Sequence, residues 1–332
     1  MIKVTFCLPR SIRVKLTTHC QLKCKFCHQE GYTKTLDVDP GEFLKAVKIL
    51  KKELGFYRIH FTGGEPTLYD KFKKLISDTK KLGFINALTT NGQFRTEELP
   101  KLKKAGLDSI NFSLLTFNPY TFLNLQNVSL NIKDGVKWAK NCIDRTVQNI
   151  LTASKLLETK INCVVSTEII SPREILEFCI QNNIKLRFLN DLTQGEVATD
   201  NIKRILSEKK AVLIGHEISL LSSSHRLDYK IDNYQFGVKC IRPFFLKSLC
   251  NNCEFKKTNK CLEGFYGIRV EDTPIKIRLC LNKNCPPYVQ SLNDFLKSPQ
   301  LAEIKQEIVD IMKYLRKDSI IEEQKTKYKL NS

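Results

Sequence analysis

The sequence predicts an α/β protein in which six strand–helix units form a parallel sheet, followed by a small cysteine-rich region with a β-hairpin. Two observations support this fold class. Apolar or β-branched runs alternate with amphipathic helical patterns as far as residue 190. The runs are apolar almost throughout, which is typical of parallel strands that helices cover on both faces.

The strand–helix units are recognised by their hydrophobic periodicity. Predicted strands lie at 12–18, 57–62, 84–90, 109–115, 160–166 and 184–190, and predicted helices at about 40–54, 70–82, 96–105, 145–158 and 172–182. The connection at 116–145 is long and holds the only tryptophan, Trp138, and the sequence leaves open whether it shapes a pocket or caps the sheet. From 193 to 235 the alternation is lost, and SLLSSSHRLD has the composition of a loop.

These patterns divide the chain into four segments. We expect a barrel-like domain at 1–195, a connecting segment at 196–235, a cysteine-rich region at 236–290 and a helical tail at 291–332. In the third segment, GIRVEDTPIKIRLCL alternates around turn residues and predicts the hairpin. In the tail, LAEIKQEIVDIMKYL has helical apolar spacing and is expected to pack on the core.

The chain is basic, with 54 Lys and Arg against 35 Asp and Glu and a formal net charge of +19. The lysines are spread over predicted helix surfaces, as in LKAVKILKKELG, so we interpret them as solvated faces and do not expect a nucleic-acid partner. A basic field still attracts a phosphorylated small substrate. The charge is therefore compatible with nucleotide binding.

Hydropathy and cysteine content predict a cytoplasmic protein. No segment has the length and hydropathy of a membrane span, so no membrane partner is expected, and the start MIKVTFCLPR lacks the apolar stretch of a signal peptide. In a chain without an export signal, 13 cysteines indicate a reducing compartment and metal ligation rather than disulfides.

Cys20, Cys24 and Cys27 form the spacing C-x3-C-x2-C in THCQLKCKFCHQEG. A [4Fe–4S] cubane held by three thiolates keeps one iron free for a small chelating ligand, whereas a cluster used only for electron transfer normally takes four. Zinc and unliganded thiols are the alternatives. A structural zinc site usually adds a second cysteine pair at moderate distance, but the next cysteine here is Cys142. The triplet therefore favours a reactive iron–sulfur centre.

Five further cysteines lie close together in a second region: Cys250, Cys253, Cys261, Cys280 and Cys285. This density predicts a metal site. The C-x2-C pair alone fits zinc or a redox pair, while Cys261 and Cys280 lie at separations suited to completing a four-ligand site after the hairpin. The sequence leaves open whether Cys240, Cys261 or Cys285 is a ligand, and structural zinc remains the alternative.

Three motifs follow the first triplet in order: HFTGGEPTL at 60–68, LTTNG at 88–92 and INFSLL at 110–115. Together with the triplet they resemble the radical S-adenosylmethionine (radical SAM) superfamily. The resemblance implies a partial (β/α)6 TIM-type barrel, with the motifs at the C-terminal ends of its strands. It also implies that SAM chelates the free iron and that one electron from the reduced [4Fe–4S] cluster cleaves SAM to a 5′-deoxyadenosyl radical.

The motif residues have physical reasons for binding the cofactor. Gly63 and Gly64 lack side chains, so their backbone can approach the charged ammonium of SAM closely. Glu65 adds an acceptor beside them, and Pro66 fixes the turn. Phe26, just before the third cysteine, is suited to stacking on the adenine.

The second cysteine region narrows the resemblance. A CxxC pair followed by a hairpin that ends in cysteine and leucine resembles the GTP 3′,8-cyclases that begin molybdenum-cofactor biosynthesis, and also the related twitch and SPASM-type enzymes. This resemblance implies a second, auxiliary [4Fe–4S] cluster. The residues expected to hold it are Cys250, Cys253, Cys261 and Cys280.

The same resemblance assigns contacts with substrate and SAM. Arg13 lies in the first motif, and Lys160 in TKINCVV matches a lysine that binds a substrate phosphate. Thr90 is expected to face the substrate. Ser113, together with the second glycine of GGEP, and Leu192 in KLRFLNDL fall at positions that contact SAM.

The chain also departs from the cyclase pattern. His60 stands where the family has an arginine, no Arg-x-Arg follows Cys253, and the sequence ends in KLNS rather than in two glycines. In the cyclases these features serve triphosphate binding, purine binding and radical control, so their loss puts GTP itself in question. Arg269 is a candidate replacement. The family's auxiliary cluster uses three cysteines, whereas Cys261 offers a fourth here.

Taken together, these features predict an enzyme. An external one-electron donor reduces the first cluster, and the radical formed from SAM takes a hydrogen atom from a bound small molecule, with cyclisation of a nucleotide as the favoured reaction. The alternative is a twitch or SPASM-type oxidoreductase or maturase that acts on a peptide or another small molecule. A non-catalytic iron–sulfur or zinc protein is the third possibility.

Overall fold

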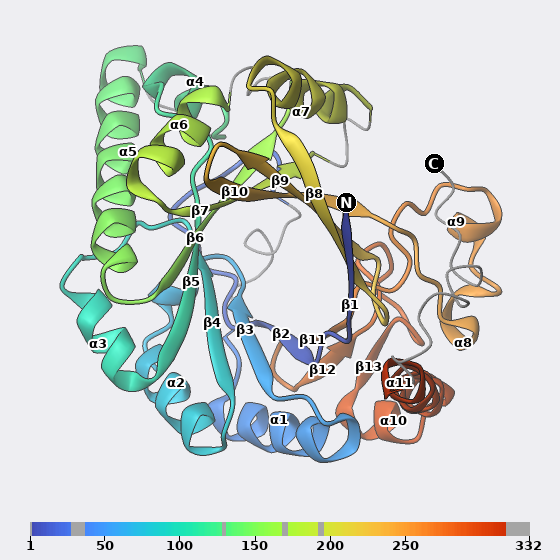
Figure 1. Ribbon diagram of the computed structural model, residues 1–332. Coiled ribbons are helices and arrows are strands. Elements are labelled where there is room, and N and C mark those ends of the chain that lie inside the picture. The colour runs from blue at the N-terminus through green and yellow to red at the C-terminus, as the bar shows by residue number, and fades with distance from the viewer. Residues whose placement is uncertain (1, 28–36, 128–130, 168–171, 192–195, 317–332) are drawn as a thin grey trace.

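The computed structural model describes residues 2–27, 37–127, 131–167, 172–191 and 196–316. Its strands form one sheet that curls around a central axis, with helices on the outside (Figure 1). Within the described residues this sheet has 13 strands, in the order β1-β8-β9-β10-β7-β6-β5-β4-β3-β2-β11-β12-β13. The first strand, β1 (Lys3–Cys7), pairs parallel with β8 at one edge of the sheet.

Six adjacent parallel strands form the predicted half of a barrel, and this prediction is confirmed. They are β2 (Ser11–Lys15), β3 (Arg58–Thr62), β4 (Ile85–Thr90), β5 (Leu107–Ser113), β6 (Glu158–Val165) and β7 (Lys185–Asn190). The helices that follow them are α1 (Pro40–Leu54), α2 (Phe72–Lys81), α3 (Glu98–Ala105), α4 (Pro119–Asn124), α5 (Ile132–Ser154) and α6 (Arg173–Asn182). The helix expected from 145 is longer than predicted, because α5 already begins at Ile132.

Local sequence explains where these helices begin and end. The Asp39 side chain accepts a hydrogen bond from the Glu42 amide at 2.9 Å, and Pro40 opens α1, as N-terminal caps require. The helix ends at Gly55, whose φ of 65° is left-handed. The buried side of α1 then packs Phe43, Val47 and other apolar residues onto the sheet.

The prediction of a loop at SLLSSSHRLD holds for residues 220–223, which form a turn, but the rest of this stretch lies in strands. After α7 (Glu196–Glu208), strands β8 (Val212–Ser219), β9 (Ser224–Ile231) and β10 (Tyr234–Ile241) extend the sheet, and β10 pairs parallel with β7. β9 lies between two antiparallel neighbours but is partly exposed along most of its length. Residues 226–231, RLDYKI, alternate polar and apolar as a strand does, and the apolar ones pack against the core. The serine-rich run before them gave the segment the composition of a loop.

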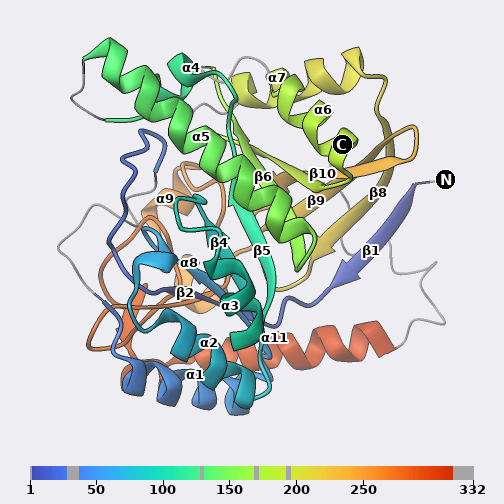
Figure 2. The same ribbon diagram turned by 90° about the vertical axis from the view of Figure 1, so that its left-hand side faces the viewer.

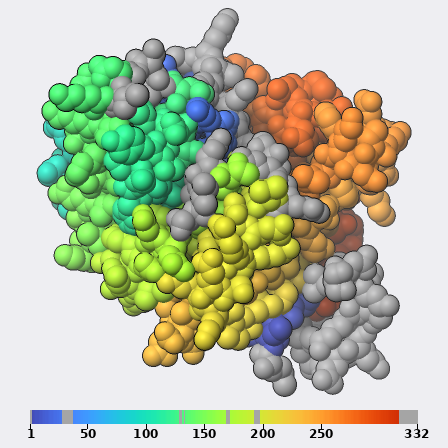
Figure 3. All heavy atoms as spheres, turned by 90° about the horizontal axis from the view of Figure 1, so that it is seen from above, coloured from blue at the N-terminus to red at the C-terminus, as the bar shows by residue number. Residues whose placement is uncertain are grey.

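The cysteine-rich region closes one side of the sheet. It contains α8 (Lys247–Cys250), α9 (Glu254–Lys257), β11 (Ile268–Glu271), β12 (Lys276–Arg278), β13 (Val289–Ser291) and α10 (Leu292–Leu296). The hairpin prediction is confirmed, since β11 and β12 are antiparallel, and β11 also pairs parallel with β2. From above, this orange region and the green α4–α5 region lie on opposite sides of the molecule (Figure 3).

The predicted helical tail forms α11 (Pro299–Arg316), with Leu301, Ile304 and Ile311 buried. It lies beside α1 at the base of the sheet (Figure 2). Core packing of this helix is therefore confirmed. In the described part of the chain, no helix has the length and apolar character needed to cross a membrane.

Candidate active site

The first cysteine loop follows β2 directly. The thiols of Cys20, Cys24 and Cys27 lie close enough for their charges to interact: burial raises the pKa of Cys20 to about 11 and of Cys24 to about 12, and neighbouring thiolates add to both shifts. Among the described residues, no three cysteine, histidine or carboxylate side chains converge on a single metal ion. A cubane binds each thiolate at a different iron, so its three sulfurs need to lie near one another without meeting at a single point.

Side-chain amides support two of these sulfurs. The Asn91 amide donates to the Cys20 sulfur at 3.6 Å, and the Gln126 amide donates to the Cys24 sulfur at 3.3 Å. The Gln126 carbonyl oxygen also accepts from the Lys23 backbone at 3.0 Å. Hydrogen bonds to cluster sulfurs raise the reduction potential of iron–sulfur centres. Sequence analysis found the LTTNG motif that holds Asn91 but gave this amide no role, and it missed Gln126, which lies in no motif.

The connection at 116–145 braces the cysteine loop. The Leu125 carbonyl accepts from the Lys25 amide at 2.9 Å, and the Asn127 amide donates to the Lys23 carbonyl at 2.8 Å. Trp138 packs on Phe122 at 5.8 Å between ring centroids, in an apolar cluster that includes Leu22. The sequence left the role of this connection open, and in the structure it holds the cysteine loop from the side of α4 and α5.

The GGEP glycines let the β3 loop lie directly on the cysteine loop. A Cβ atom on Gly63 would stand 2.4 Å from the Thr17 carbonyl oxygen, and one on Gly64 would stand 2.2 Å from the His19 carbonyl oxygen. The Gly64 amide donates to the Thr17 carbonyl at 2.8 Å. Only glycine fits at these positions, so the pair fixes the cysteine loop as well as leaving room for a ligand.

Glu65 is fully buried and ties the β3 loop to the β4 loop. Its carboxylate accepts from the Thr67 amide and hydroxyl, from the Thr90 hydroxyl at 2.8 Å and from the Asn91 amide at 2.8 Å. Burial raises the pKa of Glu65, while these donors oppose the rise. The buried Pro66 opens a short 3₁₀ helix, η1 (Pro66–Leu68).

A cavity of about 330 Å³ lies beside these loops at the C-terminal ends of the strands. Six predicted site residues line it: Arg13, Phe26, Cys27, Gly63, Ser113 and Lys160. Thr90 is buried against Glu65, and its neighbour Thr89 faces the cavity instead. The other predicted residues of the first loops do not line the cavity; these are Cys20, Cys24, Gly64, Glu65 and Pro66. Leu192 lies outside the described residues.

The cavity is strongly cationic. Lys160 and Asn162 both lie on β6, and Arg187 is the cross-strand partner of Asn162 on β7. All three side chains line the cavity. Burial, and after it the charge of Arg187, lowers the pKa of Lys160 to about 7. The buried side-chain oxygen of Asn162, Oδ1, has no hydrogen-bond partner and is available to a ligand. Arg187 was missed because its strand was predicted without assigning which face points inward.

His60 contributes a neutral group where the cyclase pattern has an arginine. It is half-buried among cations, and desolvation, followed by the charges of Arg13 and Lys160, lowers its pKa well below the usual range. Its Nε2 atom contacts the Thr89 hydroxyl at 2.6 Å and the Asn111 amide at 3.3 Å. The site therefore offers a polar but uncharged wall at this point.

Tyr266 completes the cavity from the cysteine-rich side. Lys239 lies 4.4 Å from its ring centroid, and Arg13 and Arg269 each lie at 5.9 Å. Burial opposes ionisation of the phenol, but these three cations outweigh it and lower the pKa of Tyr266 to about 8. Including Lys160 and Arg187, five cationic side chains line the cavity, against the carboxylates of Asp191 and Glu263.

The second cysteine group also comes together. The charges of Cys253, Cys261 and Cys280 all act on Cys250, whose pKa burial raises to about 12. The Gly264 amide donates to the Cys261 sulfur at 3.3 Å.

The remaining two candidate ligands are differently placed. Cys285 is exposed, and Cys240 lies on β10 opposite His225 of β9. Leu281, next to Cys280, lines the cavity that Cys27 reaches from the other side. The cavity therefore lies between the two cysteine groups.

Comparison with known proteins defines the class. Residues 14–179 match the family model of the radical SAM superfamily, and the chain belongs to this family. The chain is therefore an enzyme of a family that uses a [4Fe–4S] cluster and SAM. The three thiols of the first loop fit such a cluster.

Particular relatives are cyclases. The chain is 32% identical over 280 residues to GTP 3′,8-cyclase of Aliarcobacter butzleri, covering 76% of this chain and 78% of that protein. It is 26% identical over 313 residues to a probable GTP 3′,8-cyclase of Sulfolobus acidocaldarius, covering 90% and 88%. Among solved structures, Streptococcus suis SuiB bound to S-adenosylmethionine has a TM-score of 0.57 at 16% identity, covering 90% of this chain and 68% of SuiB, which shows a shared fold.

Proposed function

We propose that this radical SAM enzyme cyclises a nucleotide, in a reaction like that of the GTP 3′,8-cyclases. The observation that carries the proposal is the cavity of about 330 Å³ beside Cys27, lined by five cationic side chains. Such a volume suits a small molecule, and a buried cluster of cations is costly unless it meets anionic groups. A phosphorylated substrate meets that requirement.

The cationic side chains of the cavity anchor the phosphates of the substrate. Arg13, Lys160 and Arg187 bind the phosphates, with the planar guanidinium groups suited to two oxygens at once. Lys239 and Arg269 add charge from the opposite wall, around Tyr266. Held in this way, the substrate presents its sugar to the loops that carry the cysteines.

The first loops hold the cofactor. The cluster is held by Cys20, Cys24 and Cys27, and SAM is held by backbone of the GGEP loop, by Ser113 and by stacking on Phe26. When bound, the cluster and SAM supply a 5′-deoxyadenosyl radical that abstracts a hydrogen atom from the substrate. The predicted contact at Leu192 belongs to the same proposal and lies outside the described residues.

The auxiliary cluster is the second part of the proposal. Cys250, Cys253, Cys261 and Cys280 are close enough to influence one another electrostatically and supply four thiolates. A cubane with four protein ligands has no open iron for a purine, so this cluster transfers electrons rather than binding substrate. About eight irons per chain are then expected after anaerobic reconstitution.

The experiment is anaerobic incubation of the reconstituted chain with SAM, dithionite as the one-electron donor, and a nucleotide panel. Formation of 5′-deoxyadenosine together with a nucleotide product of altered structure supports the proposal. Cys20→Ala is the control and should form no 5′-deoxyadenosine. No nucleotide-dependent turnover would favour the second candidate.

The second candidate is a twitch or SPASM-type oxidoreductase or maturase that acts on a peptide or another small molecule. Two observations favour it: the neutral His60 replaces a cyclase arginine, and Cys261 supplies a fourth auxiliary thiol. A peptide substrate would need the cavity to open further than about 330 Å³. Turnover with a peptide and not with any nucleotide would establish this alternative.

A further inference from the structure

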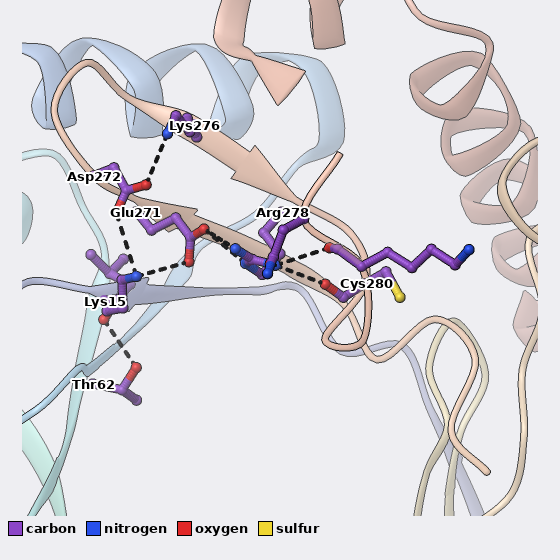
Figure 4. Close-up of polar contacts among 10 residues, drawn as sticks. Lys15, Thr62, Glu271, Asp272, Lys276, Arg278 and Cys280 are labelled. Atoms are coloured by element: carbon purple, nitrogen blue, oxygen red, sulfur yellow. Dashed lines mark hydrogen bonds and ion pairs between the residues drawn. The ribbon is translucent and has the colours of Figure 1, made fainter. Parts of the chain in front are cut away.

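We propose that Arg278 is a positioning residue for Cys280: held by Glu271, which also pairs with Lys15, it fixes the loop that presents this thiol to the auxiliary cluster. The inference rests on the auxiliary cluster of the proposed function. It concerns a network of charged side chains between the strand that precedes the first cysteine loop and the loop that carries Cys280 (Figure 4).

Glu271 is the anchor of this network. It lies on β11 with a side chain only 4% exposed, and its Oε1 atom accepts from the Nε of Arg278 at 2.7 Å and pairs with Nη2 at 2.7 Å. Its Oε2 atom lies 3.4 Å from the ammonium of Lys15. A carboxylate this deeply buried is stable only with such partners, so Glu271 holds the guanidinium in one orientation.

The other edge of the guanidinium faces the cysteine loop. Nη1 of Arg278 donates to the Cys280 carbonyl at 3.3 Å, to the Lys283 carbonyl at 3.1 Å and to the Asn284 side-chain oxygen at 2.8 Å. Three acceptors from five consecutive residues thus converge on one nitrogen. Figure 4 shows the side chain reaching from Glu271 on one side to Cys280 on the other.

This clamp orients the peptide groups around the sulfur. The backbone amides of Asn282 and Lys283 donate toward the Cys280 thiol. Arg278 holds the carbonyls of Cys280 and Lys283, and so it keeps the same turn folded around the sulfur. Lysine cannot reproduce this arrangement, because a single ammonium lacks the rigid planar fork of arginine.

Lys15 connects the clamp to the first cysteine loop. It is the last residue of β2, which leads directly into the segment that carries Cys20, and β2 pairs with β11 through Val14 and Val270. Lys15 also lies 3.4 Å from Asp272, the neighbour of Glu271. The network therefore sets the auxiliary loop against the strand that positions the SAM-binding cluster.

The test compares wild type with Arg278→Gln and Arg278→Lys, using the full chain reconstituted anaerobically with iron and sulfide. Without the clamp, Cys280 should release its iron as Fe²⁺ in a share of the molecules, which leaves a [3Fe–4S]⁰ cluster. Ferricyanide, added as a one-electron oxidant, then converts this cluster to [3Fe–4S]⁺, whose EPR signal should be at least about fivefold above that of wild type treated in the same way. Arg278→Gln should also lower the reduction potential of the auxiliary cluster, since a nearby cation stabilises its reduced form. Arg278→Lys keeps the charge, so it should show the EPR signal with a potential near that of wild type.

Two further variants separate positioning from folding. Asn284→Ala removes one of the three acceptors without disturbing Glu271 and should give a weaker [3Fe–4S] signal. Lys276→Gln is the matched control, because Lys276 is a cation of the same hairpin that pairs with Asp272 at 3.2 Å and has a side chain 46% exposed. It should leave both the EPR signal and the potential unchanged.

The outcomes are distinguishable. Wild-type protein with only about four irons per chain would overturn the auxiliary cluster itself, and with it the proposed function of that region. Eight irons in wild type, with Arg278→Gln indistinguishable by EPR and potential, would overturn only the role of Arg278. Loss of both clusters on Arg278→Gln, with Asn284→Ala like wild type, would also contradict it, since Arg278 would then serve the fold as a whole.

Discussion

Gly64→Ala is the perturbation whose size the structure defines best. The new Cβ would stand 2.2 Å from the His19 carbonyl oxygen, whereas real Cβ contacts almost never fall below 3.0 Å. The loops must therefore separate by at least 0.8 Å, the difference between these two distances. The atoms nearest to this Cβ belong to the backbone of Thr18 and His19, so no flexible side chain can move aside.

That separation weakens the hydrogen bonds that join the GGEP loop to the first cysteine loop. The Glu65 amide donates to the His19 carbonyl at 2.7 Å and the Gly64 amide to the Thr17 carbonyl at 2.8 Å, and a shift of 0.8 Å takes both to the limit of a hydrogen bond. Two lost hydrogen bonds cost about 1–3 kcal/mol, and the overpacking adds about 1–3 kcal/mol. We expect a local destabilisation of about 2–6 kcal/mol, concentrated on the segment that carries Cys20.

The assay is iron content and EPR of the reconstituted protein, with 5′-deoxyadenosine formation as the second readout. Gly64→Ala should lose the first cluster while keeping the second, whereas a variant that only weakens SAM binding would keep both. Gly41→Ala is the control, because its Cβ would meet only the Asp39 side chain, at 3.2 Å. A Gly64→Ala protein with wild-type iron content and wild-type SAM cleavage would refute this reasoning.

Three further predictions follow from single contacts. Affinity for inorganic triphosphate, measured by calorimetry, should fall as pH rises from about 6.5 to 9: Lys160, with its pKa of about 7, loses its charge first, and Tyr266, with its pKa of about 8, then gains a negative one. Tyr266→Phe should abolish the upper step, and an affinity that does not change with pH would contradict both assignments. Gln126→Leu removes a donor to the Cys24 sulfur and should lower the reduction potential of the first cluster in an EPR redox titration, and a potential that is unchanged or higher would show that this contact does not tune the cluster. Glu65→Gln places an amide nitrogen opposite one of the four donors, the Asn91 amide, and should lower the free energy of unfolding by about 1–3 kcal/mol in chemical denaturation. A variant as stable as wild type would mean that the carboxylate does not join the two loops.

The sequence predicted the repeating half of the fold because its information is local there. Strands β2 to β7 are short apolar runs, and each is followed by a helix or a glycine-rich motif. The strand β9 escaped prediction although residues 226–231 alternate polar and apolar, because the serines of the turn before it gave the whole stretch the composition of a loop. An alternating run that begins directly after a serine-rich turn is easily assigned to that turn.

The candidate site was predicted where a motif marks it and missed where only topology does. Cys27, Gly63 and the other motif residues belong to short local motifs whose spacing can be recognised in the sequence. Lys239 and Tyr266, by contrast, reach the cavity from β10 and from the cysteine-rich region, both outside the segment predicted as the barrel. Their meeting depends on how β10 and β11 join the sheet, which no local pattern reveals.

The central claim is that the cationic cavity holds a nucleotide beside the centre that cleaves SAM. The most direct test is anaerobic turnover with nucleotides deuterated throughout the ribose, followed by mass spectrometry of the 5′-deoxyadenosine. The account predicts deuterium in 5′-deoxyadenosine with at least one nucleotide, and none in the Lys160→Ala or Arg187→Ala variants at the same substrate concentration. Abundant 5′-deoxyadenosine that carries no deuterium with any nucleotide would contradict it.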